Sequence, residues 1–181
     1  ISGMAAIIGK NSEFIESIIN EKKLNIEIAN DNSPIQVVVS GMIKDIESSK
    51  AVFESQGVKK YIKLNVSAAF HSKYMLDAQN KLNIEINTTN FSSPEMPIIS
   101  NFNALINSEK KEVINSLKNQ MSNMVKWTDS IKKLEETGIS EIIEIGPGKV
   151  LSGLISRISK KFDIKTINKI EDMERFIQNG P

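Results

Sequence analysis

The chain has 181 residues, 40% of them hydrophobic and 25% charged, with a formal net charge of +1. This composition is typical of one globular domain, or of two small lobes that share a core, and it offers no broad basic surface for nucleic acid. There is no cysteine and only one histidine, which excludes a disulfide framework and a cysteine nucleophile and argues against a metal site. No apolar run is long enough to span a bilayer. The lack of cysteine suits a reducing compartment, so we expect a cytoplasmic protein that does not bind membranes.

Strands and helices alternate in the first 66 residues. Four strands are predicted where apolar residues run continuously or alternate with period two, at residues 3–9, 24–28, 35–39 and 60–66. Helices are predicted after Asn11 and after Gly41, where apolar residues recur at helical spacing. Residues 30–34, Asn-Asp-Asn-Ser-Pro, are predicted to form a loop because these residue types favour turns. The β-α-β-β-α-β order is the ferredoxin-like pattern, and it predicts a four-stranded antiparallel sheet with both helices on one face.

Helices dominate the remainder of the chain. They are predicted at residues 72–89, 110–121, 128–136 and 150–158, with a last helix around residues 173–177. Short apolar runs predict strands at residues 98–100, 141–145 and 162–167. Alternation of strands with helices predicts parallel strands and right-handed crossovers. We therefore predict an α/β protein with a ferredoxin-like small subdomain at residues 1–66 and part of a larger subdomain with a parallel sheet at residues 67–181.

The single histidine, His71, lies where the fourth predicted strand is followed by a helix, in the sequence Ser-Ala-Ala-Phe-His-Ser. An imidazole can take up and release a proton near neutral pH, so this position makes His71 a candidate general acid and base. The alternative is a surface or capping histidine, the commoner role of a lone histidine. From the residue alone both interpretations stay open.

A second motif, Gly146-Pro147-Gly148-Lys149, follows a predicted strand and precedes a helix. A phosphate-binding loop needs a serine or threonine after the lysine, and Val150 stands there instead. We therefore favour a structural turn in which glycine supplies the required backbone dihedrals.

Six segments occur together in a fixed order: residues 3–9 (GMAAIIG), 30–34 (NDNSP), 67–72 (SAAFHS), 97–101 (PIISN), Gln120 with 125–127 (VKW), and 144–151 (EIGPGKVL). In this combination they resemble the C-terminal part of the malonyl-CoA:acyl-carrier-protein transacylase family. The segments around His71 and Gly146 are the most specific. The resemblance runs from Gly3 to about Ile167, and Met124 stands where the family usually has proline.

The resemblance implies an enzyme of fatty-acid biosynthesis that moves malonyl from coenzyme A to acyl carrier protein through an acyl-serine. In it, His71 is the general acid and base, and Gln120 orients the histidine through its backbone carbonyl. Phe70 and Asn32 are implied to contact the substrate, and no cofactor is needed beyond the coenzyme A thioester. Phenylalanine before the histidine accompanies malonyl selection in this family. The implied large subdomain is α/β-hydrolase-like.

Parts of the family pattern are absent. The chain contains no Gly-x-Ser-x-Gly nucleophile elbow, and it opens on Ile1 directly before a predicted strand. We therefore expect the serine, the malonyl-binding arginine and the oxyanion loop to belong to a missing N-terminal half, without which this chain is inactive. Two alternatives remain: the acyltransferase domain of a polyketide synthase, and a non-catalytic module that keeps the fold and docks a carrier protein.

Overall fold

The computed structural model describes residues 1–179. They form two compact units, Ile1–Ser130 and a second unit that begins at Ile131. Helix α5 (Trp127–Glu136) contains the division between them. The subdomain boundary predicted between residues 66 and 67 lies within the first unit and stays a prediction.

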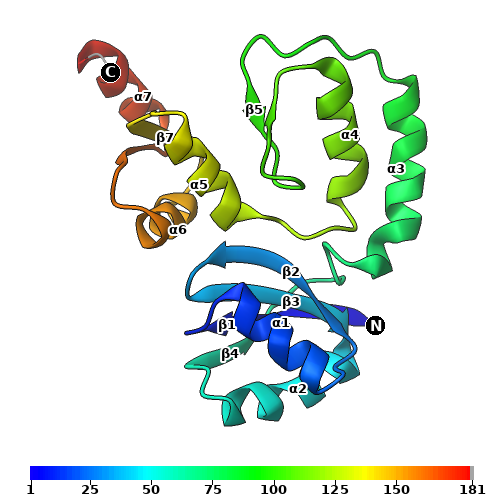
Figure 1. Cartoon of the computed structure of the whole chain (residues 1–181). Coiled ribbons are helices and arrows are strands. Elements are labelled where there is room, and N and C mark those ends of the chain that lie inside the picture. The colour runs from blue at the N-terminus through cyan, green and yellow to red at the C-terminus, as the bar shows by residue number, and fades with distance from the viewer. Residues whose placement is uncertain (180–181) are drawn as a thin grey trace. The chain divides into compact units, whose positions relative to one another are not determined.

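The first unit opens with the predicted β-α-β-β-α-β order (Figure 1). Its elements are β1 (Ser2–Ile8), α1 (Ser12–Glu21), β2 (Ile26–Ser33), β3 (Gln36–Met42), α2 (Ile43–Ser55) and β4 (Lys60–Lys63). The strands form one sheet in the order β2-β3-β1-β4, and each neighbouring pair is antiparallel. The predicted four-stranded antiparallel sheet is therefore confirmed.

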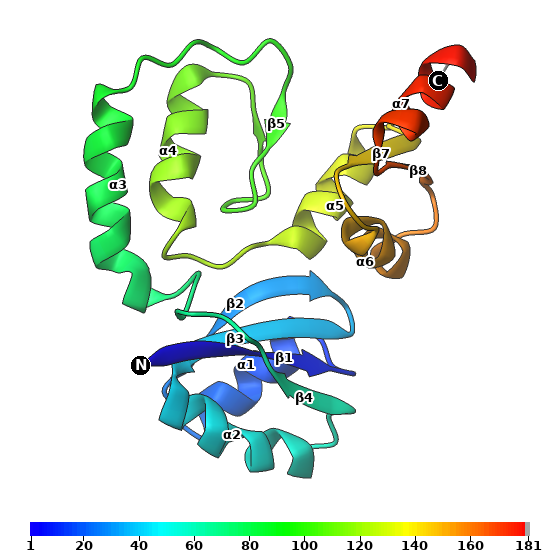
Figure 2. The ribbon, with the colours of Figure 1, turned by 180° about the vertical axis from the view of Figure 1, so that it is seen from behind.

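Both helices pack on one face of this sheet. Ile7 of β1 and Val39 of β3 are fully buried there, in one cluster with Ile15 and Ile18 of α1 and Phe53 of α2. Figures 1 and 2 show the sheet from its two sides, with α1 in front of the strands in one view and behind them in the other. Because side chains alternate along a strand, the opposite face carries its own residues, a smaller buried cluster of Met4, Ala6, Ala29 and Val38.

The prediction of a loop at residues 30–34 is wrong for most of that segment. Strand β2 continues to Ser33, with Asn30 opposite Val38 and Asp31 opposite Val37, and its register shifts twice, once between Ile28 and Asn30 and again between Asp31 and Ser33. The other edge of β2 is paired as well, because the Val125 N–H donates to the Ala29 carbonyl (2.8 Å) and the Asp31 N–H donates to the Val125 carbonyl (2.9 Å). Pairing on both edges outweighs the local preference of Asn and Asp for turns.

Two neighbouring helices follow the sheet in the first unit. The segment contains a 3-10 turn (Lys73–Met75), α3 (Leu76–Thr88), β5 (Ile98–Ile99), β6 (Ile106–Asn107) and α4 (Lys110–Gln120), and α3 and α4 lie side by side (Figures 1 and 2). The prediction of a parallel strand near residue 98 is wrong, since β5 pairs antiparallel with β6. A tight turn folds the chain back on itself, with the Ala104 N–H donating to the Ser100 carbonyl at 2.8 Å, and so short a connection allows only antiparallel pairing.

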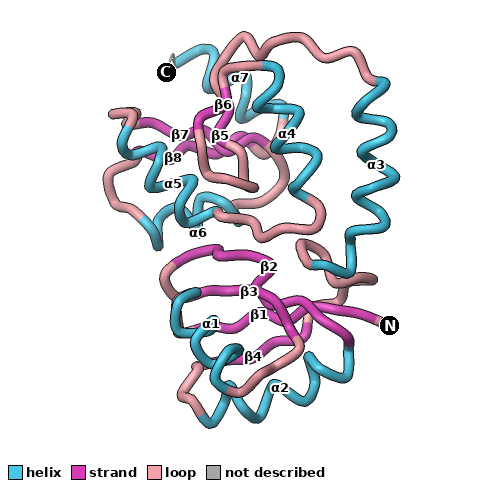
Figure 3. Tube along the Cα trace, turned by 45° about the vertical axis from the view of Figure 1, so that its right-hand side comes forward, coloured by secondary structure: helices cyan, strands magenta, loops and turns pink. Residues whose placement is uncertain are grey.

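The second unit contains a parallel pair of strands. Its elements after α5 are β7 (Glu141–Ile145), α6 (Val150–Ile158), β8 (Asp163–Ile167) and α7 (Ile170–Asn179). Strands β7 and β8 are parallel and in register from Glu141 opposite Asp163 to Ile145 opposite Ile167, and Figure 3 shows them as neighbouring strands. This β-α-β unit confirms the parallel strands predicted for this part of the chain. None of the helices described in residues 1–179 is long and apolar enough to cross a membrane.

A buried carboxylate joins three segments of the first unit. Asp31 of β2 is 9% exposed, and it accepts hydrogen bonds from Thr128 Oγ1 (2.8 Å) and Ser12 Oγ (3.1 Å). Burial raises the pKa of Asp31 above its ordinary value of 3.8, and the charges of Asp129 and Glu13 add to the rise, whereas the two hydrogen bonds oppose it. Asp31 thus links the starts of α1 and α5 to the sheet, although burial disfavours its charged form.

We predict that Ile15→Ala lowers the free energy of unfolding by about 2–5 kcal/mol, because it opens a cavity between α1 and the sheet. The matched control is Ile84→Ala on α3, where the side chain is 63% exposed and the expected change is within about 0.5 kcal/mol. Urea denaturation of the three chains measures both values. Equal losses would contradict the placement of the main core between the two helices and the sheet.

A further prediction concerns pH. Because the pKa of Asp31 is raised in the folded chain, the folded state holds its proton more tightly than the unfolded state, and stability falls as pH rises through the interval above 3.8. Asp31→Asn keeps the hydrogen-bonding shape without the charge. We expect the free energy of unfolding, compared between pH 4 and pH 7, to fall less in the variant than in the parent chain. Identical pH dependence in the two chains would show that burial does not disfavour the charged form of Asp31.

Candidate functional site

The segment of residues 67–72 lies against the second face of the sheet. Side chains of β1 and β3 hold it there: Ser40 Oγ donates to the Phe70 carbonyl (2.6 Å), and the Ala69 N–H donates to Ser2 Oγ (3.0 Å). Within the segment, the buried Ser72 Oγ donates to the Ala69 carbonyl (2.6 Å). The turn that carries the single histidine is therefore fixed at several backbone positions.

His71 itself adopts an unusual backbone conformation. Its φ is +58°, in the left-handed region that costs a residue with a β-carbon about 1–2 kcal/mol. Its N–H donates to the Met121 carbonyl at 3.1 Å. Residues held in such conformations cluster at functional sites, where the surrounding contacts over-determine them.

The imidazole of His71 contacts the end of α4. Nδ1 lies 3.0 Å from the backbone carbonyl oxygen of Gln120, the last residue of that helix. A carbonyl oxygen can only accept, so Nδ1 carries the hydrogen and Nε2 of the neutral ring is left as the basic nitrogen. Helix C-termini present carbonyls without partners inside the helix, and here a side chain satisfies one of them.

A glutamine on α3 fixes the chain just beyond this contact. Gln79 is 6% exposed, and its Oε1 accepts from both the N–H (3.0 Å) and the Oγ (2.8 Å) of Ser122. The carbonyl that orients His71 thus belongs to a backbone held by the neighbouring helix.

Of the four residues implied by the family resemblance, the structure brings two into contact. His71 contacts the Gln120 carbonyl, and Phe70, 37% exposed, adjoins the histidine in the chain. Asn32 lies in the irregular part of β2, and in residues 1–179 no hydrogen bond joins it to the other three. The same described residues contain no group of three or more His, Asp or Glu side chains placed to hold a metal ion.

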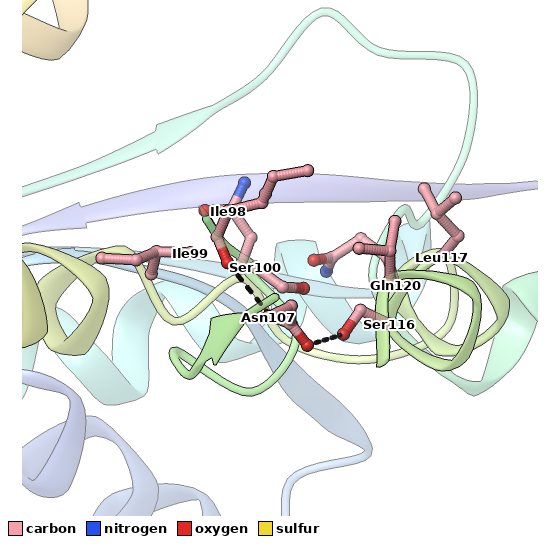
Figure 4. Close-up of a pocket in the computed structure, with 9 residues that line it drawn as sticks. Ile98, Ile99, Ser100, Asn107, Ser116, Leu117 and Gln120 are labelled. Atoms are coloured by element: carbon pink, nitrogen blue, oxygen red, sulfur yellow. Dashed lines mark hydrogen bonds between the residues drawn. The ribbon is translucent and has the colours of Figure 1, made fainter. Parts of the chain in front are cut away.

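A cavity that the sequence did not indicate adjoins Gln120. Its volume is about 260 Å³, and its lining combines apolar and polar groups from β5, β6 and α4 (Figure 4). The labelled lining residues are Ile98, Ile99, Ser100, Asn107, Ser116, Leu117 and Gln120. Asn107 Nδ2 donates to the Ile98 carbonyl (3.3 Å) and Ser116 Oγ donates to Asn107 Oδ1 (3.2 Å), so the polar floor is internally bonded. The sequence gives one hint of this lining: Val113, Leu117 and Gln120 recur at helical spacing and therefore share one face of α4.

The Gly146-Pro147-Gly148 segment belongs to the second unit and forms a capped turn. The carboxylate of Glu144 accepts from the N–H groups of Leu151 (3.0 Å) and Ser152 (2.8 Å) at the start of α6. The Ser152 hydroxyl, followed by these N–H groups, lowers the pKa of Glu144. Two of the N–H groups at the start of α6 are therefore already bonded to a carboxylate of the chain itself.

Comparison with known proteins places these features in one family. No family model matches the chain. Among curated proteins, the malonyl CoA-acyl carrier protein transacylase of Bacillus subtilis is 34% identical over 178 residues, 97% of this chain and 56% of the relative. That of Staphylococcus aureus is 33% identical, over 99% of this chain and 59% of the relative. The polyketide biosynthesis protein PksE of Bacillus subtilis is 44% identical over 88% of this chain, but only 21% of that protein is matched.

Solved structures agree with the sequence comparison. The malonyl-CoA:acyl carrier protein transacylase of Xanthomonas oryzae matches with a TM-score of 0.91 at 31% identity, covering 99% of this chain and 58% of that one. A malonyl-transacylase solved in complex with a type II polyketide acyl-carrier protein matches with a TM-score of 0.92 at 29% identity, and 59% of it is covered. By sequence and by fold, this chain belongs to the malonyl-CoA:acyl-carrier-protein transacylase family, and it spans a little over half the length of the transacylases it matches.

Proposed function

We propose that this chain supplies the acid/base part of a malonyl-CoA:acyl-carrier-protein S-malonyltransferase. The observation that carries the proposal is the contact between His71 Nδ1 and the Gln120 carbonyl at 3.0 Å, which leaves Nε2 as a proton acceptor. In this proposal β1 to β4 with α1 and α2 are the ferredoxin-like small subdomain, residues 67–181 are the C-terminal part of an α/β-hydrolase-like large subdomain, and the enzyme works in the cytoplasm.

The reaction is a double transfer. Nε2 of His71 takes the proton from a serine hydroxyl as the serine oxygen attacks the thioester carbonyl of malonyl-CoA. The carbon–sulfur bond then breaks, and the imidazolium returns the proton to the thiolate of coenzyme A. In the second half the ring takes the proton from the phosphopantetheine thiol of acyl carrier protein, the thiolate attacks the acyl-serine, and the serine oxygen recovers the proton. No cofactor is consumed.

The serine must come from outside these 181 residues, since they contain no Gly-x-Ser-x-Gly motif. We propose that the rest of the transacylase fold supplies the serine, a cation for the malonyl carboxylate and the oxyanion donors. Two observations support a missing neighbour. The chain covers only 58% of the related structure, and Ile98 and Leu117, which line the cavity at Gln120, are 45% and 43% exposed.

Acyl carrier protein is the proposed acceptor, because one related malonyl-transacylase has been solved with such a carrier bound. Phe70 and Asn32 are the proposed substrate contacts. The partly exposed ring of Phe70 adjoins His71, where it would crowd a substituent on the α-carbon of the acyl group.

A second candidate function is malonyl loading in polyketide biosynthesis. It is favoured by the identities to PksE (44%) and to the polyketide transacylase PksC (41%) of Bacillus subtilis, which exceed the 34% identity to the malonyl CoA-acyl carrier protein transacylase of the same organism. Both candidates share the chemistry above and differ in the carrier protein that is served.

The central prediction is tested by completing the enzyme. We expect residues 1–181 alone to transfer no malonyl to acyl carrier protein, and the same chain joined to the N-terminal part of a related transacylase to be active. In the joined enzyme, His71→Ala should lower kcat by about 10²–10⁴-fold. Gln120→Ala is the matched control, because it leaves the backbone carbonyl in place, and its kcat should stay within several-fold.

The contrary outcomes are distinct. Transfer by the lone chain that His71→Ala abolishes would place a nucleophile within these residues. A joined chain that folds and binds carrier protein but transfers nothing would favour the non-catalytic module.

A separate prediction concerns the acyl group. In the joined enzyme, Phe70→Ser is expected to narrow the gap in kcat/KM between malonyl-CoA and methylmalonyl-CoA, because it removes the ring that crowds the extra methyl. One methyl group is typically discriminated by about 1–3 kcal/mol. The ratio of the two kcat/KM values should therefore change by no more than about 200-fold. Phe14→Ser, a change on α1 away from the histidine turn, is the control. An unchanged ratio in Phe70→Ser would remove Phe70 from substrate selection.

A further inference from the structure

We propose that Ser40, a buried serine of β3, is a positioning residue for His71. Its catalytic consequence rests on the proposed function, but its structural basis does not. Ser40 is fully buried, lies opposite Met4 in the sheet, and is separated from the histidine by about thirty positions of sequence. Neither the family resemblance nor the comparisons assign it a role.

The peptide group between Phe70 and His71 is hydrogen-bonded at both ends. Its carbonyl oxygen accepts from Ser40 Oγ at 2.6 Å, and its N–H donates to the Met121 carbonyl at 3.1 Å. A peptide group is planar, so a hydrogen bond at each end fixes the direction of the N–Cα bond of His71. The sheet holds one end of this plane and the end of α4 holds the other.

This fixed plane accounts for the unfavourable φ of +58° at His71. Rotation toward an ordinary φ would swing either the Phe70 carbonyl away from Ser40 or the imidazole away from Gln120. Ser40 is fully buried, and its hydroxyl would lose its acceptor if the Phe70 carbonyl swung away, which is costly for a buried polar group. The two bonds of this peptide group therefore hold the left-handed conformation and keep Nδ1 at 3.0 Å from the Gln120 oxygen. Without the Ser40 hydroxyl, the carbonyl loses its donor and the turn is free to relax.

The relaxed turn should lose the tautomer that catalysis uses. Only when Nδ1–H faces the Gln120 carbonyl is the neutral ring held with Nε2 as its basic nitrogen. A ring released from that carbonyl populates both tautomers and several orientations. Since the chain has a single histidine, the state of this ring can be read directly by NMR of its two ¹⁵N-labelled nitrogens.

The test compares two buried serines in the 181-residue chain. Ser40→Ala is expected to replace the single Nδ1–H tautomer of the parent chain with an exchanging mixture. Ser49→Ala is the matched control: Ser49 is also fully buried and also bonds a carbonyl, that of Ile46 at 2.9 Å, but it lies on α2, which packs on the other face of the sheet. A folded Ser40→Ala chain with the tautomer of the Ser49→Ala chain would overturn the proposal.

Two further variants cover the case in which Ser40→Ala does not fold. Ser40→Thr and Ser40→Val have nearly the same shape, both suit a strand, and only the first keeps the hydroxyl. We expect the Thr variant to keep the Nδ1–H tautomer and the Val variant to lose it. Equal tautomer populations in these two chains would also overturn the proposal.

Activity then distinguishes this inference from the function proposed above. In the enzyme completed with an N-terminal part, Ser40→Ala should lower kcat about 10- to 100-fold with KM within two-fold, since small misplacements of a catalytic group have effects of this size. Ser49→Ala should leave kcat unchanged. If the completed parent enzyme transfers no malonyl while the NMR result holds, the function fails and the positioning role stands. If the parent is active and Ser40→Ala keeps both kcat and the tautomer, the positioning role fails alone.

Discussion

The first unit depends on one long-range constraint, the attachment of the His71 turn to the end of α4. The histidine gives two hydrogen bonds there, from its ring to Gln120 and from its N–H to Met121. Between the two partners the chain must travel out along α3 and back along α4, so the side-by-side packing of these helices follows from that closure. Gln79 strengthens it, because its side chain binds Ser122 just beyond α4. The geometry of the site is thus a property of the helix pair and the sheet together.

Much of the first unit could be predicted because its signals are local. Strands β1, β3 and β4 carry continuous or alternating apolar residues, and α1 begins where Asn11 caps the N–H of Phe14, so periodicity and capping identify them. The wrong predictions concern segments whose secondary structure depends on hydrogen bonds to residues distant in the sequence. Residues 30–33 have turn-forming side chains, yet they form a strand because Val125 and β3 supply hydrogen bonds on both sides. No pattern within the segment records that Val125 lies there.

The candidate site likewise contains residues that could be predicted from the sequence and residues that could not. His71 and Gln120 could be selected from sequence because they sit in recognisable segments, and their contact follows from the fold of those segments. Ser40 could not, since a serine in a strand is usually read as an outward-facing residue, and only the packed turn reveals that it faces the Phe70 carbonyl. The cavity beside Gln120 was missed for a related reason. Asn107 and Ser116 are 3% and 4% exposed, and buried polar residues become intelligible only when their partners are known.

The second unit contains a parallel sheet of only two strands in the part of the chain that the structure describes. Parallel sheets normally have both faces covered, yet no residue of β7 or β8 is fully buried in the described chain, and Ile145 is 78% exposed. Apolar strands that expose this much area gain stability when further strands or helices cover them. In the first unit, the exposed side chains of Ile98 and Leu117 have the same character, and they line a cavity together with Gln120. In the proposed complete enzyme, a part that covers these side chains would also stabilise α4, whose last carbonyl orients His71, so we expect completion of the fold and completion of the active site to be one event.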